Sequence, residues 1–432
     1  MVEGLRAGGH AAYFVGGCVR DELLGRTPRE YDVATDAEPD RVQHLFQRNV
    51  AVGKRFGVII CLVGDVPVEV ATFRSDDAYV DGRRPTSVRY SSAREDAERR
   101  DFTMNALYYD PATDEVLDFV GGREDLANRV LRAIGDPRRR FAEDKLRLLR
   151  AVRFAATIPA EPEAGTWAAV REMAPLITQV SWERIREELS RILVSGHAER
   201  GLRLLEETGL LEPILPELSA LRGVAQPPEF HPEGDCWVHT LLCLRHLDAL
   251  PERPLPLALG ILLHDIGKPA TFTIAERIRF DGHDRVGAAL ACDVLRRLRY
   301  PNAVIEEVVE LVRRHMAFTQ IREWRTAKLK RFLTSDLAAT HLDLHRLDCL
   351  GSHGLLDTHD WCRARRVEYL SEPPPAPRLV TGTDLLAAGY PSGPLIGRVL
   401  AAIDDERLEG RLDSKEEALA WAVANHPPAE RP

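Results

Sequence analysis

The spacing of apolar residues changes near residue 136, and this change limits what the chain can fold into. Before it, short β-rich runs alternate with turn residues, and "GVIICLVGDVPVEVATF" is two such runs joined by Gly64-Asp65, a hairpin signal. After it the apolar period becomes helical, and residues 141–157 present one apolar stripe of a single expected helix. The sequence therefore predicts an α+β head followed by an all-α body.

Proline-rich and polar segments indicate further boundaries. The segment "RGVAQPPEFHPEGD" is typical of a linker or an irregular entrance to another domain, and "SEPPPAPRLV" is a second break. The polar run "RSDDAYVDGRRPTSVRYSSARED" is expected to be a mobile loop. We therefore expect four domains: a head over 1–136, a helical neck over 137–220, a helical domain over 221–365 and a helical tail over 378–432.

Composition limits the partners and the compartment. The 432 residues are 44% apolar, enough for buried cores, and the net charge of −9 predicts no general attraction to nucleic acid or to an anionic membrane. A polyanion must therefore bind at a local basic patch, and residues 129–153 hold nine Lys or Arg against three Asp or Glu. Seven cysteines without a CxxC pair fit reduced thiols in the cytoplasm. No stretch approaches the roughly 18 apolar residues of a membrane span, so no membrane partner is expected.

Acidic residues stand alone within β-rich runs of the head. If "YDVAT" is a strand, Glu30 and Asp32 point to the same face. In "VPVEVATFR", Glu69 alternates with apolar residues and so projects from the face of its strand opposite to theirs. Neighbouring carboxylates repel unless a cation lies between them, and Mg²⁺ with substrate phosphates would satisfy them. Glycines before Cys18 would let a phosphate approach the backbone, and Arg20 would add a bidentate contact. Taken alone, the acid pair fits an ordinary solvent-facing strand better than a metal site, because such pairs are common.

Charged residues recur at helical spacing over 141–157. Asp144, Arg147 and Arg150 are three residues apart and would share one helical face. The plain alternative is an exposed salt-bridge ladder, which contributes only about 0–1 kcal/mol per pair.

Histidines and aspartates gather between residues 235 and 355. A lone histidine there would most often be a satisfied core or surface residue, but several in an apolar helical region suit a transition metal whose bound water becomes a nucleophile. The candidates are His239, His264, Asp265, His283, His315 and Asp348.

The motifs "GGCVRDELLGR", "EYDVAT", "VEVATFR", "RRDFTMNAL" and "EDKLRLLRAVRFAA" together resemble the class II tRNA nucleotidyltransferase and poly(A) polymerase family over roughly the first 160 residues. The resemblance implies a polymerase-β-like nucleotidyltransferase head in which Glu30 and Asp32 bind Mg²⁺. Glu69 is a candidate third catalytic acid. The family usually has Asp at the first position, so Glu30 implies a looser coordination geometry or a ligand to only one of two metals.

The same resemblance implies nucleotide contacts. It assigns Gly17 and Arg20 to the triphosphate and Arg100 to the incoming nucleotide, with Asp101 holding the sugar or the arginine. Asp144 and Arg147 would read the base of CTP or ATP, because both bases offer an amine beside a ring nitrogen. The remaining arginines that would approach the base or the triphosphate are Arg150 and Arg153.

The stretches "WVHTLLCL", "LLHDIGKP", "FDGHDRVGA", "VRRHMAF" and "HRLDCLGSHG" resemble the HD superfamily of metal-dependent phosphohydrolases over about 235–355. This resemblance implies His239, His264, Asp265 and Asp348 as core metal ligands, with His283 and His315 as ligands of a second metal. The tail motif "VTGTDLLAAGYPSGPLIGRVL" looks like the C-terminal helical segment of the nucleotidyltransferase family.

The resemblances imply an enzyme that adds CCA to the 3′ end of tRNA from CTP and ATP, with release of pyrophosphate. Three alternatives remain open: a poly(A) polymerase, an A-adding enzyme of the same family, and an HD-domain phosphohydrolase or phosphodiesterase whose nucleotidyltransferase-like part binds RNA. The full length of the loop over 75–96 argues mildly against an enzyme that adds only CC.

Overall fold

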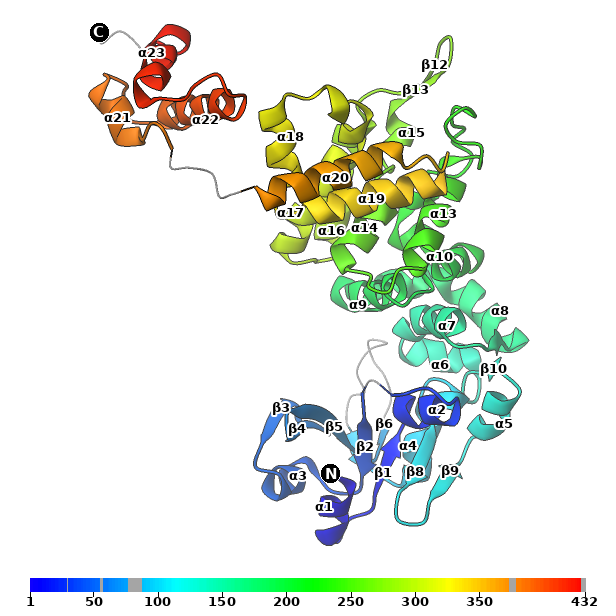
Figure 1. Ribbon diagram of the computed structural model, residues 1–432. Helices are drawn as coiled ribbons and strands as arrows, with labels where there is room; N and C mark the ends of the chain where they lie inside the picture. The colour runs from blue at the N-terminus through cyan, green and yellow to red at the C-terminus, as the bar shows by residue number, and fades with distance from the viewer. Residues whose placement is uncertain (29, 55–56, 77–87, 373–377, 429–432) are drawn as a thin grey trace. The chain divides into compact units, whose positions relative to one another are not determined.

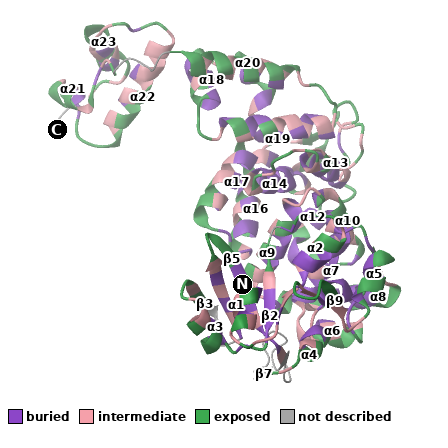
Figure 2. Cartoon of the chain, turned by 60° about the horizontal axis from the view of Figure 1, so that its bottom comes forward, coloured by how far each residue is buried: buried purple, intermediate pink, exposed green. Residues whose placement is uncertain are grey.

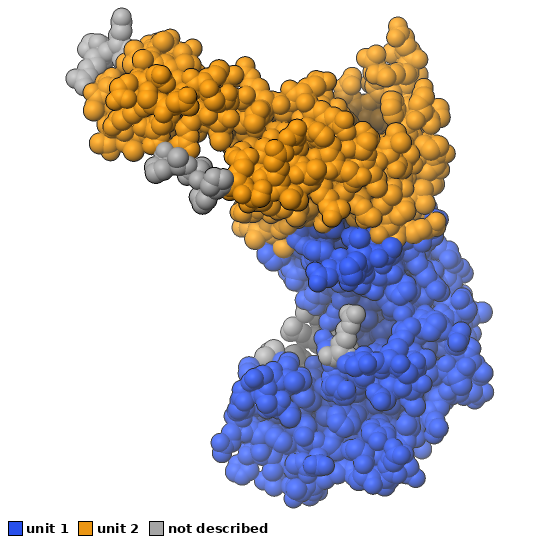
Figure 3. All heavy atoms as spheres, in the orientation of Figure 1, with its two compact units in different colours: residues 1–222, 247–258, 293–301 blue, residues 223–246, 259–292, 302–432 orange. Residues whose placement is uncertain are grey.

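The chain divides into two compact units, shown as a ribbon in Figure 1 and coloured separately in Figure 3. The computed structural model describes residues 1–432 except 29, 55–56, 77–87, 373–377 and 429–432. Unit 1 comprises 1–222, 247–258 and 293–301, and unit 2 comprises 223–246, 259–292 and 302–432.

Unit 1 begins with a mixed seven-stranded sheet, as the sequence predicted. Across the sheet the strands are β3 (Asn49–Gly53), β4 (Val58–Val63), β5 (Val66–Thr72), β2 (Asp32–Thr35), β1 (Ala12–Val15), β8 (Leu107–Asp110) and β9 (Glu115–Asp118). β2 and β5 run parallel and the other neighbours run antiparallel. The expected hairpin at Gly64-Asp65 is confirmed, with Gly64 at a φ of +62°.

One face of this sheet is covered by α1 (Val2–Ala7) and α3 (Pro39–Leu45). Val33 of β2 and Val70 of β5 are buried with these helices in one hydrophobic cluster. Because strand side chains alternate, the neighbouring residues of β2 and β5 point to the opposite face. The helix that begins at the glycine pair is α2 (Gly17–Leu23).

The polar segment that follows β5 is less irregular than the sequence predicted. β6 (Arg74–Asp76) and β7 (Val88–Tyr90) pair antiparallel, and α4 (Ala93–Glu98) begins with a capping box between Ser92 and Glu95. The expectation of a loop is therefore wrong at both ends of this segment. Its middle, 77–87, lies outside the described residues, and so does half of the loop over 75–96 whose length argued against addition of CC only.

The helical neck departs from the predicted single helix. Residues 141–157 are split between α6 (Pro137–Glu143) and α7 (Leu146–Thr157), because Asp144 is extended at φ −146° and ψ 106° and accepts from Leu146 N at 3.1 Å. α7 packs against α9 (Trp182–Leu193) and α10 (Ala198–Glu207). The other elements here are η2 (Thr103–Asn105), α5 (Gly122–Ala127), β10 (Val130–Leu131), β11 (Glu161–Pro162), α8 (Ala164–Met173), η3 (Ala174–Gln179), α11 (Leu211–Ile214) and α12 (Pro216–Ser219).

The histidine-bearing region is helical as predicted, apart from a short antiparallel hairpin of β12 (Phe272–Ile274) and β13 (Ile278–Phe280). Its helices are α13 (Cys236–Asp248), α14 (Leu255–Leu263), α15 (Lys268–Thr271), α16 (His283–Arg297), α17 (Asn302–Arg314), η4 (His315–Thr319), η5 (Ile321–Glu323), α18 (Thr326–Leu333), α19 (Ala338–Gly351) and α20 (Asp357–Ser371).

The tail consists of α21 (Gly382–Ala387), α22 (Pro394–Leu408) and α23 (Lys415–Asn425), in agreement with the sequence. Most of its residues are intermediate or exposed, and its few buried ones form a separate cluster (Figure 2). Within the described part of the chain, no helix has both the length and the apolarity needed to cross a membrane.

Candidate functional sites

Two carboxylates lie side by side on one face of the head sheet. Asp32, the first residue of β2, is the register partner of Glu69 in the neighbouring parallel strand β5. Both side chains therefore point away from the face on which Val68 and Val70 are buried. Loss of hydration and nearby negative charge raise the pKa of both carboxyl groups, while Arg100 opposes the shift. A divalent cation would relieve the repulsion of such a pair.

Glu30 does not lie on the strand with Asp32, so this part of the sequence prediction is wrong. β1 ends at Val15, the register partner of Asp32, and Glu30 lies exposed in a bend before β2 begins. Its charge still contributes to the raised pKa of Asp32 and Glu69. Among the described residues, three or more possible ligand atoms of His, Cys, Asp or Glu lie within 4.8 Å of one another only in unit 2. The three head acids therefore form no closed ligand set in this conformation.

The turn between β1 and α2 passes close to Asp32. Gly16 has a φ of +78°, and a Cβ there would lie 3.3 Å from Arg100 Nη1 and 3.9 Å from Asp32 Oδ2. Gly17, which the sequence singled out, is the first residue of α2 and lacks this conformation. The close approach expected of the glycine pair is therefore made by Gly16, whereas the resemblance assigned the triphosphate contact to Gly17.

Arg100 is fixed beside this turn by a buried acid. Its Nε and Nη2 donate to Asp96 Oδ2 at 3.3 and 3.1 Å, and its Nε also donates to the Tyr108 hydroxyl at 3.3 Å. Burial disfavours the charged guanidinium, but Tyr108 and Asp96 outweigh it and raise the pKa of Arg100. Burial likewise opposes ionisation of Asp96, yet Arg100 and Arg99 lower its pKa to about 2. The spacing of four residues between Asp96 and Arg100 was a sequence signal for this pair.

Arg20, Asp101 and Arg150 belong to one hydrogen-bonded network. Arg20 Nη1 donates to Asn105 Oδ1 at 2.6 Å, and the Asn105 amide donates to Asp101 Oδ1 at 3.2 Å. Arg150 Nε donates to the other Asp101 oxygen at 2.8 Å. Burial raises the pKa of Asp101, but the charges of Arg150 and Arg147 outweigh it and bring the pKa to about 2. The structure thus brings together three residues predicted to serve a nucleotide site.

Asp144 and Arg147 do not pair with each other. Asp144 lies in the break between α6 and α7, and its two oxygens accept from Arg184 of α9 at 3.0 and 2.7 Å. Arg147 is buried and donates to Glu143 Oε2 at 2.8 Å and to two backbone carbonyls at 2.8 and 2.9 Å. The shared helical face predicted for Asp144 and Arg147 is therefore wrong. Arg184 was missed because it lies 40 residues further along the chain.

The basic patch predicted over 129–153 is largely neutralised within the chain. Its ion pairs include Arg132–Asp125, Arg138–Glu172, Arg140–Glu143, Arg147–Glu143, Arg150–Asp101 and Arg153–Glu188. The guanidinium groups of Arg150 and Arg153 also lie over the Phe154 ring, at 5.2 and 4.1 Å from its centre. The patch therefore presents less free positive charge than the residue count suggests.

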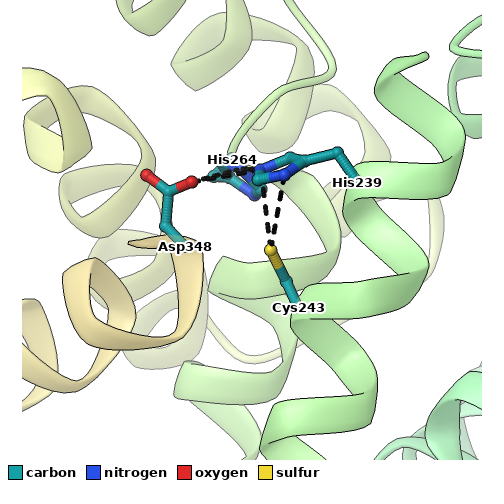
Figure 4. A group of neighbouring side chains, drawn as sticks. All are labelled: His239, Cys243, His264 and Asp348. Atoms are coloured by element: carbon teal, nitrogen blue, oxygen red, sulfur yellow. Dashed lines mark hydrogen bonds and ion pairs between the residues drawn. The ribbon is translucent and has the colours of Figure 1, made fainter. Parts of the chain in front are cut away.

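In unit 2, two groups of side chains gather around Asp265. His239 Nε2 lies 3.2 Å from His264 Nε2 and 3.1 Å from Asp348 Oδ1 (Figure 4), and His264 Nε2 lies 3.3 Å from Asp265 Oδ2. The other Asp265 oxygen lies 3.6 Å from His283 Nε2. The second group is completed by His315, whose Nε2 lies 3.0 Å from His283 Nε2 and 3.8 Å from Asp265 Oδ1. All six residues predicted as metal ligands are thus brought together, with Asp265 offering one oxygen to each group.

The ring orientations fit a cation. The Nδ1 atoms of His264, His283 and His315 donate to the backbone carbonyls of Ile261, Phe280 and Val312 at 2.8, 2.8 and 2.6 Å. With the proton on Nδ1, the Nε2 lone pairs of these histidines face one another without a proton between them. A metal ion is the group that such converging nitrogen and carboxylate atoms accept.

The carboxylates of this centre and His315 are in the ionisation states that metal binding needs, but His239 is not. Burial lowers the pKa of His239, yet Cys243, Asp348 and Glu233 outweigh burial and raise this pKa well above its usual value. Burial raises the pKa of Asp265, but His264 and Lys268 outweigh it and hold the pKa well below its usual value. Asp348 is also kept ionised despite burial, by its hydrogen bond from His239 and by the charge of His264, which lower its pKa. Burial, with the charges of His264 and His283, lowers the pKa of His315 to about 4, so this ring is neutral. Carboxylates and neutral imidazoles are the forms that bind metal.

Cys243 lies beside this centre but over the face of an imidazole ring. Its Sγ is 3.5 Å from His239 Nε2 and 4.0 Å from Nδ1, as the dashed lines in Figure 4 show. A sulfur atom nearly equidistant from both ring nitrogens is off the axis of either lone pair. Cys243 is therefore a packing partner of His239 rather than a ligand in this conformation.

The segment interpreted as a linker contributes to the same centre. Gln226 Oε1 accepts from Lys268 Nζ at 2.6 Å, and Lys268 Nζ lies 2.7 Å from Asp265 Oδ2. Glu233 Oε1 lies 2.8 Å from His239 Nδ1. Sequence reasoning missed all three residues, although Lys268 stands three residues after Asp265 in "HDIGK" and so on the same side of a helical turn.

A pocket of about 640 Å³ opens onto the metal-binding groups. Its wall includes ligand candidates from both groups together with apolar and basic residues. Those beyond the ligands include Phe230, His231, Lys268, Arg279, Phe280 and Met316. The cavity therefore has room for a small molecule next to the candidate metal centre.

Three family models match the chain in order. They are described as the poly A polymerase head domain, over residues 12–132, the probable RNA and SrmB-binding site of polymerase A, over 161–221, and the HD domain, over 237–372. Together with the strand-borne acids, these matches define the class: a nucleotidyltransferase head followed by a helical body with an HD domain.

Known proteins resemble the chain over nearly its whole length. A CC-adding tRNA nucleotidyltransferase of Thermus thermophilus is 36% identical, with 95% of this chain and 93% of the relative covered. A CCA-adding enzyme of a Geobacillus species is 31% identical, with 98% and 95% covered. This chain belongs to the family of CCA-adding and CC-adding tRNA nucleotidyltransferases.

Solved structures agree with this assignment. The CCA-adding enzyme of Bacillus stearothermophilus in complex with CTP is 28% identical and superimposes with a TM-score of 0.72, covering 98% of this chain and 95% of the other. The Thermotoga maritima CCA-adding enzyme complexed with tRNA is 20% identical with a TM-score of 0.58, covering 98% and 93%, and it supports the fold alone.

Proposed function

We propose that this chain adds CCA to the 3′ end of tRNA, using CTP and ATP and releasing pyrophosphate. The observation that carries the proposal is the pair Asp32 and Glu69, in register on adjacent strands beside the Gly16 turn and Arg100. Membership of the tRNA nucleotidyltransferase family supports the substrates, because relatives are named for CC or CCA addition. This activity, and seven free cysteines, fit a protein of the cytoplasm.

In the proposed reaction, the terminal 3′ oxygen of tRNA bonds to the α-phosphorus of the nucleotide. The bond from this phosphorus to the oxygen that bridges to the β-phosphate breaks, pyrophosphate leaves, and the hydroxyl proton passes to solvent. Asp32 and Glu69 would hold Mg²⁺, with Glu30 close by, and bound magnesium supplies charge neutralisation at the transferred phosphoryl group. Arg20 and Arg100 would face the triphosphate, held by Asn105 and Asp96.

Base selection is assigned to the break between α6 and α7. Asp144 would accept from the exocyclic amine shared by cytosine and adenine, which uracil and guanine do not offer at that position. The amine must share this carboxylate with Arg184, which occupies both oxygens. Arg147 would donate to the ring nitrogen only after giving up Glu143 or a backbone carbonyl.

The test is incorporation of labelled CTP and ATP into a tRNA that lacks CCA, with Mg²⁺ present and products resolved by length. We expect three added nucleotides, ending in A, and at most background incorporation by Asp32→Asn. Equal incorporation by wild type and Asp32→Asn would refute the assignment of the site.

Product length separates the alternatives within the family. Two added nucleotides would indicate a CC-adding enzyme, as the Thermus thermophilus relative is named. Addition only to a tRNA that already ends in CC would indicate an A-adding enzyme, and a long tail from ATP alone would indicate a poly(A) polymerase.

A metal-dependent phosphohydrolase in unit 2 is the second candidate function. The observation that favours it is the buried Asp265 offering one oxygen to each of two histidine groups at the wall of the 640 Å³ pocket. A transition metal held there would turn a bound water into a nucleophile.

Hydrolysis of p-nitrophenyl phosphate and of bis(p-nitrophenyl) phosphate with Mn²⁺, Co²⁺ or Ni²⁺ tests this second function. We expect activity in the wild type that His264→Ala abolishes while CCA addition continues. No activity with any of these metals, or equal activity of His264→Ala, would exclude a hydrolase at this centre for these substrates.

A further inference from the structure

The segment that joins α12 to α13, residues 223–235, lies outside the three family-model matches, which end at 221 and resume at 237. It is nevertheless anchored in the structure. Asp235 accepts from Val238 N at 2.8 Å, at the start of α13, and from Gly223 N at 2.6 Å. Cys236 N donates to Val224 O at 3.1 Å. The segment is therefore a loop with both ends tied together rather than a free linker.

This loop carries an acid that contacts a candidate metal ligand. Glu233 Oε1 lies 2.8 Å from His239 Nδ1 and 2.9 Å from His231 Nδ1, and its side chain is only 6% exposed. Glu233 is thus a buried acceptor that two imidazole rings share.

The contact falls on the nitrogen of His239 that the metal does not use. His239 Nε2 is the atom that faces His264 Nε2 and Asp348 Oδ1, at 3.2 and 3.1 Å. For Nε2 to bind a metal, the ring proton must be on Nδ1, and that proton needs an acceptor. Glu233 is the nearer acceptor, since the carbonyl of Gly351 lies 3.3 Å from Nδ1.

We propose that Glu233 is a positioning residue of the HD centre: it orients His239, fixes the proton on Nδ1 and so strengthens metal binding at Nε2. The proposal rests on the metal centre of the second proposed function and is independent of tRNA addition. Glu233 itself does not bind the metal.

The test measures Co²⁺ binding to the full-length, chelator-treated protein by visible absorption, against a competing chelator. The double variant His239→Ala, His264→Ala provides the blank for cobalt bound elsewhere. We expect Glu233→Ala to weaken Co²⁺ binding about 10–100-fold without changing the number of ions bound. Glu233→Gln keeps an oxygen acceptor but loses the charge, so its affinity should fall between those of Glu233→Ala and wild type.

Glu229→Gln is the matched control, because Glu229 lies in the same loop and is exposed. It should bind Co²⁺ as wild type does. Unchanged CCA addition by each Glu233 variant shows that the chain is folded and that the loss is local.

Other outcomes overturn the proposal in distinguishable ways. Wild-type affinity in both Glu233 variants would show that the Gly351 carbonyl suffices. Loss of one bound ion, with the remaining affinity unchanged, would show that Glu233 is itself a ligand, together with His231 and the Nδ1 of His239. If wild type binds no Co²⁺ above the blank, the metal centre itself is wrong, and this proposal fails with it.

Discussion

Asp32 and Glu69 stand in register on adjoining parallel strands, and the pKa of each carboxyl group is raised by lost hydration and by its neighbours. Glu30 contributes charge but is exposed and lies before the strand. The three acids therefore differ in how firmly the backbone holds them. A metal ligand whose position is fixed by strand pairing keeps its geometry, whereas a ligand in a bend can move away from the ion.

This difference predicts a graded effect of removing each acid. We expect Asp32→Asn to lower kcat/KM for CTP by at least about 100-fold, since a metal-bound carboxylate is worth several kcal/mol in phosphoryl transfer. Glu30→Gln should cost less than Asp32→Asn, because Glu30 is exposed and off the strand. Steady-state kinetics at saturating tRNA measure both, and a larger loss for Glu30→Gln would make Glu30 the principal ligand.

The raised pKa of Asp32 also has a consequence for stability. An acid with a pKa higher in the folded than in the unfolded state loses folding free energy as pH rises above its unfolded value, near 3.8. Asp32→Asn removes this penalty. In chelator at pH 7 the variant should therefore melt at a higher temperature than wild type, and the difference should shrink toward pH 3.8. Added Mg²⁺ should raise the melting temperature of wild type only. Equal melting temperatures of wild type and Asp32→Asn at pH 7 in chelator would contradict the raised pKa of Asp32 beside its neighbouring acids.

The elements of the head could be predicted from short-range signals. The hairpin of β4 and β5 follows from apolar alternation and from the turn residues Gly64-Asp65, and the structure has it. The helix over 141–157 could not, because the apolar stripe continues through a break. That break is set by Asp144, which bonds to Leu146 N and to Arg184. A contact with a residue 40 positions away cannot be detected from the spacing of apolar residues around Asp144.

The contact with Arg184 gives the next prediction. Arg184→Ala frees Asp144, whose carboxylate then loses a bidentate, partly buried partner worth about 1.5–3 kcal/mol. We expect KM for CTP and ATP to rise by about tenfold and misincorporation of UTP to increase. Arg186→Ala, a change on the same helix without contact to Asp144, is the control. An unchanged KM for CTP and ATP and an unchanged rate of UTP incorporation in Arg184→Ala would show that the Asp144–Arg184 ion pair has no role in base selection.

At the scale of the whole molecule, the two candidate centres lie in different compact units and use different ligand chemistry. The histidine centre was predicted residue by residue, because its order along the chain is distinctive. Its supporting residues were not, since Gln226 and Glu233 stand in a proline-rich segment that gives no periodic signal. Their roles depend on distances across the fold, to Lys268 and His239.

Because the two centres offer different types of ligand, we expect that, after metal removal, the two activities are restored by different metal ions. The candidate ligands Asp32, Glu69 and Glu30 of the head offer carboxylate oxygens, which suit Mg²⁺. Unit 2 offers four imidazoles with two carboxylates, which suit a transition metal. After exhaustive chelation, Mg²⁺ alone should restore CCA addition fully and leave phosphatase activity below about one tenth of its value with Mn²⁺ or Co²⁺.

His264→Ala and Asp32→Asn make this division testable in the same preparation. The first should retain CCA addition with Mg²⁺ and lack phosphatase activity with any metal, and the second should show the reverse pattern. Restoration of both activities by Mg²⁺ alone would mean that the imidazoles of unit 2 do not determine which metal the HD centre uses. Loss of both activities in either single variant would mean that the two centres depend on each other, which their placement in separate units does not predict.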